Sequence, residues 1–350
     1  MSLIPHTMKA LVLTRKDETS TPTLTLVRDH PVPVPPAGYL LIRILASAIH
    51  PSDILNAQGN FPYTSYPRIP GRDFAGTVVA IGPTDPEDSS TPPSSDHADE
   101  NHDDANSLLG ATVFGTSGNT HAFTTDGFHA EYAVVPAAGV ARVPSPAGIS
   151  HPAAAATLGV PWTTAGLALE RARVREGETV LVLGANGAVG RAAVSLARAK
   201  GCEVLRGVRG ADRGDVDTTG DPLLERVGEI TGGRGVDVVV DAVGSEALTS
   251  AAVKRLGKDG RLVFVAGMGE LRIDMREFYR MGKSVVGCNS LNETVESMGE
   301  RLRSMVASGS FDLLNGQGLE GGWEKTSLEG AVEAYSKAAA DKKRKFVVMM

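Results

Sequence analysis

The chain has 350 residues, of which 42% are hydrophobic and 22% are charged, and its formal net charge is −6 at pH 7. A chain of this length exceeds what one ordinary hydrophobic core organises, so we expect two domains. The acidic balance, and the lack of a stripe in which Lys or Arg alternate with aromatic residues, argue against nucleic acid as a partner.

Neither a membrane span nor a disulfide framework is expected. No apolar run reaches the length of a membrane span, and the first residues lack the charged and then apolar pattern of a signal peptide, so we expect a cytoplasmic protein. Cys202 and Cys288 are the only cysteines, too few for a cysteine-rich metal cage. Both lie beside apolar, strand-like sequence, which predicts that they are buried and reduced.

The first 142 residues are rich in predicted strands. Alternating or β-branched runs predict strands at residues 8–13, 24–27, 39–46, 77–82, 111–115 and 127–135. The stretch 83–107 interrupts this pattern, because its Asp, Glu, Ser, Pro, His and Asn residues leave almost nothing to bury, and we expect a disordered surface insertion. It contains His97 and His102, whose irregular spacing indicates a solvated acidic loop rather than a metal site.

After Pro144, helices and strands alternate. Predicted helices cover 149–158, 223–231 and 246–256, a further helix begins at 161, and predicted strands cover 179–183, 204–208, 236–241, 261–265 and 284–287. This alternation predicts a doubly wound parallel sheet in an α/β domain spanning 143–291. Two more helices, 295–308 and 328–340, and a strand at 345–349 follow. That strand must return to the β-rich first domain to find a sheet partner, so this domain comprises 1–142 and 292–350.

A glycine-rich turn joins the strand at 179–183 to the helical segment that follows. Gly184 permits the tight turn, Gly187 lets the backbone approach a pyrophosphate, and Gly190 lets the helix pack closely on the strand. The spacing G-x-x-G-x-x-G differs from the commoner G-x-G-x-x-G, but the strand before it and the helix after it favour a dinucleotide. The predicted contacts are Gly184, Ala185, Asn186, Gly187, Ala188, Val189 and Gly190.

The segment after the second parallel strand predicts NADPH as the cofactor. An NAD site usually ends this strand with an acid for the ribose hydroxyls, whereas a 2′-phosphate requires arginine. No acid ends the strand here, so Arg209 is the predicted phosphate contact, with Arg206 and Arg213 as alternatives. A merely solvated loop arginine is the competing interpretation. Further cofactor contacts are expected where later strands end, at Asp241, Val243, Gly244, Gly267, Met268 and Asn289.

The order of these parts resembles the medium-chain dehydrogenase/reductase superfamily over nearly the whole chain. The resemblance is carried by residues 49–61, 70–76 and 127–135 and by the glycine turn. It implies a GroES-like β-rich domain plus an inserted Rossmann domain. Within the superfamily the sequence is similar to the zinc-free quinone oxidoreductase and 2-enoyl thioester reductase branch. One departure is that relatives carry a full helix between the second and third parallel strands, where this chain has too few residues for one.

Ligand count argues against the zinc-dependent branch of the superfamily. Its catalytic metal takes a cysteine after an early strand, a histidine from a Gly-His-Glu turn and a further thiolate. In this chain Ser47-Ala48 stands near the first position and Arg72-Asp73 occupies the second. We therefore expect no metal site.

The resemblance implies that hydride is delivered to a quinone or to the C=C of an α,β-unsaturated carbonyl, with the tyrosine of a Gln-Gly-x-Tyr motif as hydrogen-bond donor. Phe61 stands in that place and cannot donate. His50 and Tyr63, both in the loop from His50 to Tyr66, are the candidate catalytic donors, with Tyr66 as a further option. Thr164 is a candidate partner near the nicotinamide. A structural histidine and a tyrosine that only lines a wall stay open as interpretations.

We therefore expect an NADPH-dependent, zinc-free reductase of small-molecule quinones or enones. Two alternatives stay open: a specialised biosynthetic enoyl reductase, and an NADPH-binding sensor or scaffold without catalysis. Relatives often pair through the last Rossmann strand, here near 283–288, which implies a homodimer.

Overall fold

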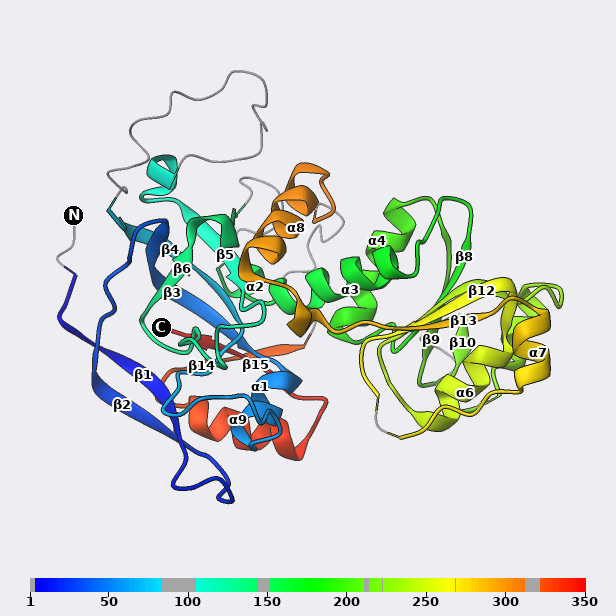
Figure 1. Cartoon of the computed structure of the whole chain (residues 1–350), viewed down its shortest axis with the longest axis horizontal. Helices are drawn as coiled ribbons and strands as arrows, with labels where there is room; N and C mark the ends of the chain where they lie inside the picture. Colours follow the sequence, from blue (N-terminus) through cyan, green and yellow to red (C-terminus); the bar gives the residue numbers. More distant parts are fainter. Residues whose placement is uncertain are drawn as a thin grey trace. The chain divides into compact units, whose positions relative to one another are not determined.

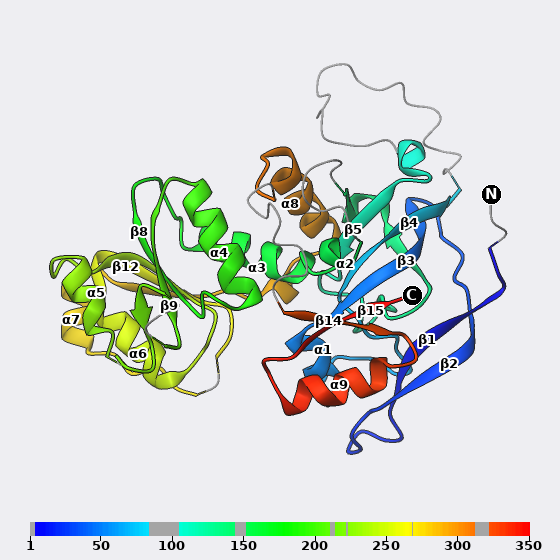
Figure 2. The ribbon, with the colours of Figure 1, turned by 180° about the vertical axis from the view of Figure 1, so that it is seen from behind.

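The computed structural model of the protein describes residues 4–83, 105–143, 152–210, 214–221, 223–267, 269–311 and 322–350 (Figures 1 and 2). The chain forms two compact units, the first from Met1–Val160 and Leu291–Met350 and the second from Pro161–Ser290. The division after Val160 comes later than the boundary that we expected after Arg142. Among the described residues, no helix has both the length and the apolar character that crossing a bilayer requires.

The first unit is built on β-sheets. Strands β1 (Thr7–Thr14) and β2 (Thr23–Pro31) form an antiparallel pair, and a larger sheet has the order β14-β15-β3-β4-β5-β7 with β6 beside β3. The bounds of the larger sheet's strands are β3 Tyr39–Ile49, β4 Asp73–Ile81, β5 Thr112–Thr116, β6 Tyr132–Pro136, β7 Val140–Arg142, β14 Trp323–Ser327 and β15 Lys345–Met349. Leu40, Ile42, Phe74 and Phe128 form part of its buried core.

The C-terminal segment returns to this unit, as predicted. Strand β15 pairs antiparallel with β3, Phe346 opposite Ile49, and parallel with β14. Helices α8 (Val295–Ala307) and α9 (Ala331–Ala340) lie close to the ranges that the sequence predicts. Figures 1 and 2 both show α9 beside α1 (Pro51–Ala57), and α9 also packs on β14 and β15. Pairing of β15 with β3 therefore joins the C-terminal segment to the first unit.

Three segments of the first unit differ from the sequence prediction. The segment from His50 to Tyr66 is not a plain loop, because its first part forms helix α1, with Pro51 at the helix start. Only the end of the predicted strand 127–135 is a strand, since the N–H groups of Phe128 and His129 donate to the turn at Pro70 and Gly71 instead.

The third difference is the predicted helix 149–158. Residues 149–151 lie outside the described residues, Pro152–Ala155 forms the short helix α2, and a turn separates it from α3 (Gly159–Arg171). Most of the expected insertion 83–107 also lies outside the described residues. Its last residues belong to a short 3-10 helix, Ala105–Leu108, which is anchored by buried Leu108.

The second unit is a parallel six-stranded sheet of the Rossmann type. Its order is β10-β9-β8-β11-β12-β13, which is the 3-2-1-4-5-6 order of dinucleotide-binding sheets, so the predicted fold class is confirmed. The strand bounds are β8 Thr179–Leu183, β9 Glu203–Val208, β10 Val216–Asp217, β11 Val236–Asp241, β12 Leu256–Phe264 and β13 Ser284–Gly287. Strand β12 begins earlier than the predicted Arg261 because Leu256 already pairs with Val236.

Helices cover both faces of this sheet. Helix α4 (Ala188–Ala199) lies on one side and α5 (Glu225–Ile230) and α6 (Glu246–Lys254) lie on the other (Figures 1 and 2). The short helix α7 (Met275–Arg280) precedes the edge strand β13. Strand β9 leads to β10 with no helix in the part of that connection that the structure describes. An open groove lined by Leu205, Asp215, Arg226 and Ile230 runs beside these two strands.

Candidate functional site

The glycine turn joins β8 to α4 in the geometry that the sequence predicts. Gly184 has a φ of +75°, in the left-handed region that favours glycine. A Cβ on Gly190 would lie 2.1 Å from Gly184 O, so the close approach of α4 to β8 requires glycine there. Gly187 is the N-cap of α4, and the N–H groups of the first helical turn have no intrahelical acceptor. This turn fits the pyrophosphate of a dinucleotide.

The other predicted residues of the turn differ in exposure. Ala185 is buried, Ala188 and Val189 are half-buried in the first turn of α4, and Asn186 is exposed. The backbone oxygen of Asn186 accepts a hydrogen bond from Arg191 Nε at 3.1 Å. The exposed backbone at Asn186 and Gly187 is therefore open to a ligand.

A buried carboxylate holds the turn after β11. Asp241 accepts hydrogen bonds from the N–H groups of Val243 at 2.8 Å and Gly244 at 3.0 Å, and from the hydroxyl of Thr249. Its side chain is therefore occupied within the protein and shapes the turn, while Val243 is 39% exposed. Gly267 and Asn289, at the ends of neighbouring strands, are exposed, and Met268 lies outside the described residues.

Arginines surround the end of β9. Arg209 is exposed and makes no ion pair or hydrogen bond among the described residues. Arg206 is instead held by Asp215, with Nε 3.4 Å from Oδ2, and Arg213 lies outside the described residues. Asp217 accepts hydrogen bonds from Gly210 N and Thr219 N, which lowers the pKa of its carboxyl. Of the described candidates, Arg209 has the side chain that remains available for a phosphate.

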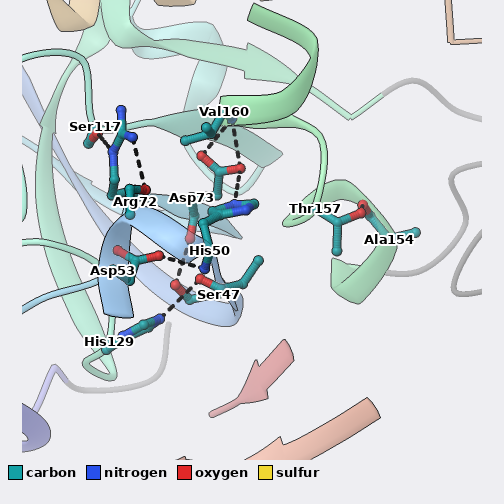
Figure 3. A network of polar contacts seen from close by, with 12 residues as sticks. Ser47, His50, Asp53, Arg72, Asp73, Ser117, His129, Ala154, Thr157 and Val160 are labelled. Carbon is teal, nitrogen blue, oxygen red and sulfur yellow. Dashed lines mark hydrogen bonds and ion pairs between the residues drawn. The ribbon is translucent and has the colours of Figure 1, made fainter. Parts of the chain in front are cut away.

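A second polar site lies in the first unit, between the end of β3 and the start of β4 (Figure 3). His50 is the N-cap of α1 and is only 3% exposed. Its Nε2 lies 2.7 Å from Asp73 Oδ2, and because a carboxylate only accepts, Nε2 carries the proton. The same carboxylate accepts from Val160 N at 2.8 and 2.9 Å, and the hydroxyl of Ser47 donates to Asp73 O. His50 is thus fixed by its partners.

Asp53 is the second buried carboxyl of this cluster. Its Oδ2 accepts from His50 N at 2.8 Å, whereas its Oδ1 is buried without a hydrogen-bond partner among the described residues. Burial raises the pKa of Asp53 to about 6, because one backbone N–H and the nearby positive groups only partly offset the loss of water. The carboxyl therefore titrates near neutral pH.

Arg72 lies beside these carboxyls and is only 4% exposed. Its Nε donates to Ser117 Oγ at 2.9 Å and its Nη1 to Ser52 Oγ at 3.1 Å, and its guanidinium lies 5.7 Å from the centroid of the Phe123 ring. Burial lowers the pKa of Arg72, although Asp53 and Asp73 act in the opposite direction. Figure 3 shows the Arg72 side chain extending toward Ser117, away from the His50 ring.

Tyr63 belongs to an aromatic cluster rather than to the hydrogen-bond network of His50. Its ring centroid lies 5.7 Å from that of Phe61 and 5.4 Å from that of Phe123, and the residue is 48% exposed. Burial raises the pKa of Tyr63, and Arg72 opposes this effect. The hydroxyl of Tyr66 is buried and has no hydrogen-bond partner among the described residues. Tyr63 is therefore the more accessible of the two candidate donors.

Thr164 lies in α3, within the second unit. Its Oγ1 is buried and has no hydrogen-bond partner in the described parts of the chain. An unpartnered buried hydroxyl is uncommon, which is consistent with a group reserved for a ligand or water.

The donor set of the polar cluster does not fit a zinc ion. The His50 ring and the Asp73 carboxylate bind each other, and a guanidinium lies in the same cluster. Within the described ranges, no group of three or more His, Cys, Asp and Glu residues is arranged to hold a metal. Cys202 and Cys288 lie in the second unit, and both are buried thiols outside any disulfide, as predicted.

Sequence reasoning missed how Asp73 and Arg72 act in this site. Both were noted only because they stand where a zinc-dependent relative has other residues. Asp73 binds Val160, which is distant in sequence, and no local pattern predicts such a contact. Two charged residues directly before the buried run that starts at Phe74 were the available signal, since charged groups next to a core strand need partners.

Comparisons with known proteins agree with this architecture. The sequence model of the alcohol dehydrogenase GroES-like domain matches residues 36–145, and that of the zinc-binding dehydrogenase domain matches residues 188–304. A zinc-type alcohol dehydrogenase-like protein of Schizosaccharomyces pombe is 38% identical over 98% of this chain and 97% of its own. Human quinone oxidoreductase is 27% identical over 89% and 88% of the two chains.

A crystal structure of an alcohol dehydrogenase superfamily protein from Novosphingobium aromaticivorans superposes with a TM-score of 0.77 at 26% identity, covering 98% of this chain and 100% of that one. The sheet order, the glycine turn and these matches define a nicotinamide-dependent oxidoreductase. The chain belongs to the medium-chain dehydrogenase/reductase superfamily, in its quinone oxidoreductase-like branch.

Proposed function

We propose that this oxidoreductase uses NADPH, without zinc, to reduce a quinone or the C=C of an α,β-unsaturated carbonyl. The observation that carries the proposal is the pairing of a Rossmann-type glycine turn with a polar cluster whose imidazole and carboxylate bind each other instead of a metal. NADPH supplies the hydride in such a reaction. The similarity to human quinone oxidoreductase supports quinones as the substrate class.

The residues of this chain have separate parts in the proposal. The backbone at Asn186 and Gly187 and the N-terminus of α4 bind the pyrophosphate, and Arg209 binds the 2′-phosphate. Asp241 positions the turn at Val243 and Gly244. In the first unit, Tyr63 is the proposed donor to the substrate oxygen, and His50, whose ring N–H is already donated to Asp73, is the second proposed catalytic residue. Thr164 adds a hydroxyl in the second unit that has no partner among the described residues. We propose a cytoplasmic homodimer that pairs through the edge strand β13.

The test is NADPH oxidation with a panel of quinones and enones, in the presence of a chelator and with NADH as the comparison. We expect turnover of several acceptors, preference for NADPH, and no effect of the chelator. Arg209→Gln should weaken NADPH binding about tenfold or more, because a charge-assisted contact to the 2′-phosphate is lost. NADH binding should stay unchanged.

Preference for NADH in the unmodified protein would contradict the assignment of Arg209. Cofactor binding without turnover of any acceptor would contradict the proposed reaction and favour a sensor. Arg198→Gln is the matched control, since this exposed arginine lies in the last turn of α4, at the end away from the glycine turn, and should leave the binding of both cofactors unchanged.

A further inference from the structure

Arg72 is a buried cation without a directly paired anion. Among the described residues no carboxylate lies within 4.0 Å of its guanidinium, and its hydrogen bonds go to two neutral hydroxyls, Ser117 Oγ and Ser52 Oγ. These bonds use Nε and Nη1, and Nη2 has no partner within the described chain. One nitrogen of the fork is therefore free to donate.

The neighbouring carboxylates are occupied elsewhere. Asp73 binds His50 Nε2 and Val160 N, and the Oδ2 of Asp53 binds His50 N. They act on Arg72 only over a longer distance, by raising its pKa against the effect of burial. Burying an unpaired charge costs roughly several kcal/mol of stability, and two hydroxyl partners offset only part of this cost. A bound anion would complete the site.

Aromatic rings surround the guanidinium of Arg72 and favour a flat ligand. Phe123 presents its ring to the guanidinium, and Phe61 and Tyr63 complete a cluster with centroids 5.2 to 5.7 Å apart. Phe123 is fully buried, but Tyr63 is 48% exposed, so the cluster reaches the surface of the unit at Tyr63. Arg72 and Tyr63 both contact Phe123, because the Arg72 guanidinium lies 5.7 Å and the Tyr63 ring centroid 5.4 Å from the Phe123 ring centroid.

We propose that Arg72 binds the substrate's carbonyl oxygen and stabilises the negative charge that develops on it. This inference rests on the proposed function and names the charge-stabilising group of the same reaction. As hydride from NADPH adds to the β carbon of an enone, the C=C π electrons form a double bond between the α carbon and the carbonyl carbon. The carbonyl π electrons move onto oxygen, which becomes an enolate oxygen, and NADPH becomes NADP⁺. An N–H of Arg72 donates a hydrogen bond to that oxygen, and a proton from solvent water then adds to the α carbon to give the saturated carbonyl compound.

Turnover of Arg72 variants tests this role. With an acceptor that the unmodified protein reduces, Arg72→Met should lower kcat/KM about 10²–10³-fold, the usual loss when one oxyanion donor is removed, with unchanged affinity for NADPH. Arg72→Lys keeps the charge and should recover part of the loss. Arg68→Met is the control, because Arg68 pairs with Asp126 and Ser65 and should leave kcat/KM unchanged.

A spectroscopic readout makes the inference independent of turnover. 4-Nitrophenol is a flat probe whose oxygen ionises, and its phenolate absorbs visible light. Bound to the unmodified protein with NADP⁺ present, it should ionise at lower pH than in water, and this shift should disappear in Arg72→Met. Circular dichroism shows whether each variant is folded. If Arg72→Met does not fold, the same measurements on Arg72→Lys test the role of Arg72.

The outcomes separate the two proposals. A shift of the probe that depends on Arg72 supports the oxyanion site even if no acceptor is reduced, in which case only the proposed function fails. Turnover that is unchanged in Arg72→Met, or a probe that does not bind or ionises equally in both proteins, overturns the role of Arg72.

Discussion

Two buried carboxyls, Asp53 and Asp73, lie in one cluster with different partners. Asp73 accepts hydrogen bonds from an imidazole and a backbone N–H. Asp53 accepts one hydrogen bond, from a backbone N–H, and its Oδ1 has no hydrogen-bond partner among the described residues. Hydrogen bonds to a carboxylate favour its charged form, and burial disfavours it. The charge of the buried Asp53 therefore depends on pH near neutrality, since its pKa is raised to about 6.

This pKa predicts how stability changes with pH in Asp53→Asn. A carboxyl whose pKa is raised on folding, here from 3.8 to about 6, favours the folded state below pH 3.8, and this contribution is lost as the pH rises through about 6. The penalty at pH 7 is about 3 kcal/mol from about two pKa units. We expect the stability of Asp53→Asn relative to the unmodified protein to rise by up to this amount between pH 4 and pH 7, measured by urea unfolding.

Asp29→Asn is the control for this series. Asp29 is exposed in β2 and its side chain has no hydrogen bond or ion pair in the described structure, so the effect of Asp29→Asn on stability should be the same at pH 4 and pH 7. A difference between Asp53→Asn and the unmodified protein that stays constant from pH 4 to pH 7 would show that Asp53 does not titrate in this range.

At the residue scale, the sequence predicts positions whose role is set by local geometry. Gly184 and Gly190 were found because a strand, a turn and a helix follow one another in the chain, and the φ of one and the close contact of the other agree with their predicted roles. His50 was singled out as a polar residue in a loop, but its partner Asp73 comes from a different strand. Such pairs depend on tertiary packing and leave no periodic signal.

At the scale of elements, a chain of two hydrogen bonds links helix α9 to strand β3. Tyr335 O–H lies 3.0 Å from His129 Nδ1, and His129 Nε2 lies 3.2 Å from Ala48 O. Because the carbonyl can only accept, Nε2 carries the proton and Nδ1 accepts from the tyrosine. Burial lowers the pKa of His129 to about 3, so the ring is neutral at physiological pH.

Removing this hydroxyl should destabilise the first unit. In Tyr335→Phe the buried Nδ1 of His129 loses its donor, which we expect to cost about 1–3 kcal/mol. The midpoint of thermal unfolding should fall. Tyr132→Phe is the control, because Tyr132 lies in β6, which pairs with β3, and its hydroxyl has no hydrogen-bond partner in the described structure. An equal fall in both variants would contradict the proposed link.

The sequence predicts helices and strands correctly where the hydrophobic period and the turn residues indicate the same element. The strands and helices of the second unit alternate clearly, and their predicted order was confirmed. Helix α1 was missed because its seven residues are too few to show a helical period. Strand β14, Trp323–Ser327, was missed because it is mostly polar and gains its partner only through β15. Tertiary pairing decides such short segments.

At the scale of the whole molecule, the second unit is continuous in sequence and the first is not. All predicted cofactor contacts, from Gly184 to Asn289, lie within the second unit. We therefore expect residues 161–290 to fold alone, since the unit has its own sheet, core and helices. A cooperative thermal transition and binding of NADPH by this fragment are the measurements.

The fragment that carries Arg209→Gln serves as the control, and it should keep the thermal transition while binding NADPH more weakly. A fragment without a cooperative transition would show that the second unit depends on the first for its stability, contrary to this prediction.

The pairing of β15 with β3 also determines the order in which the protein is completed on the ribosome. Strand β3 is made early, and its partner β15 emerges only after the whole second unit has been synthesised. Until then the end of β3, residues 46–49, lacks a strand partner on the side that β15 later covers, and its backbone N–H and C=O groups are prone to pair with other chains. The second unit can reach its final structure during this interval, because domains fold as units while synthesis proceeds. The cofactor-binding half of the enzyme is thus finished before the half that begins the chain.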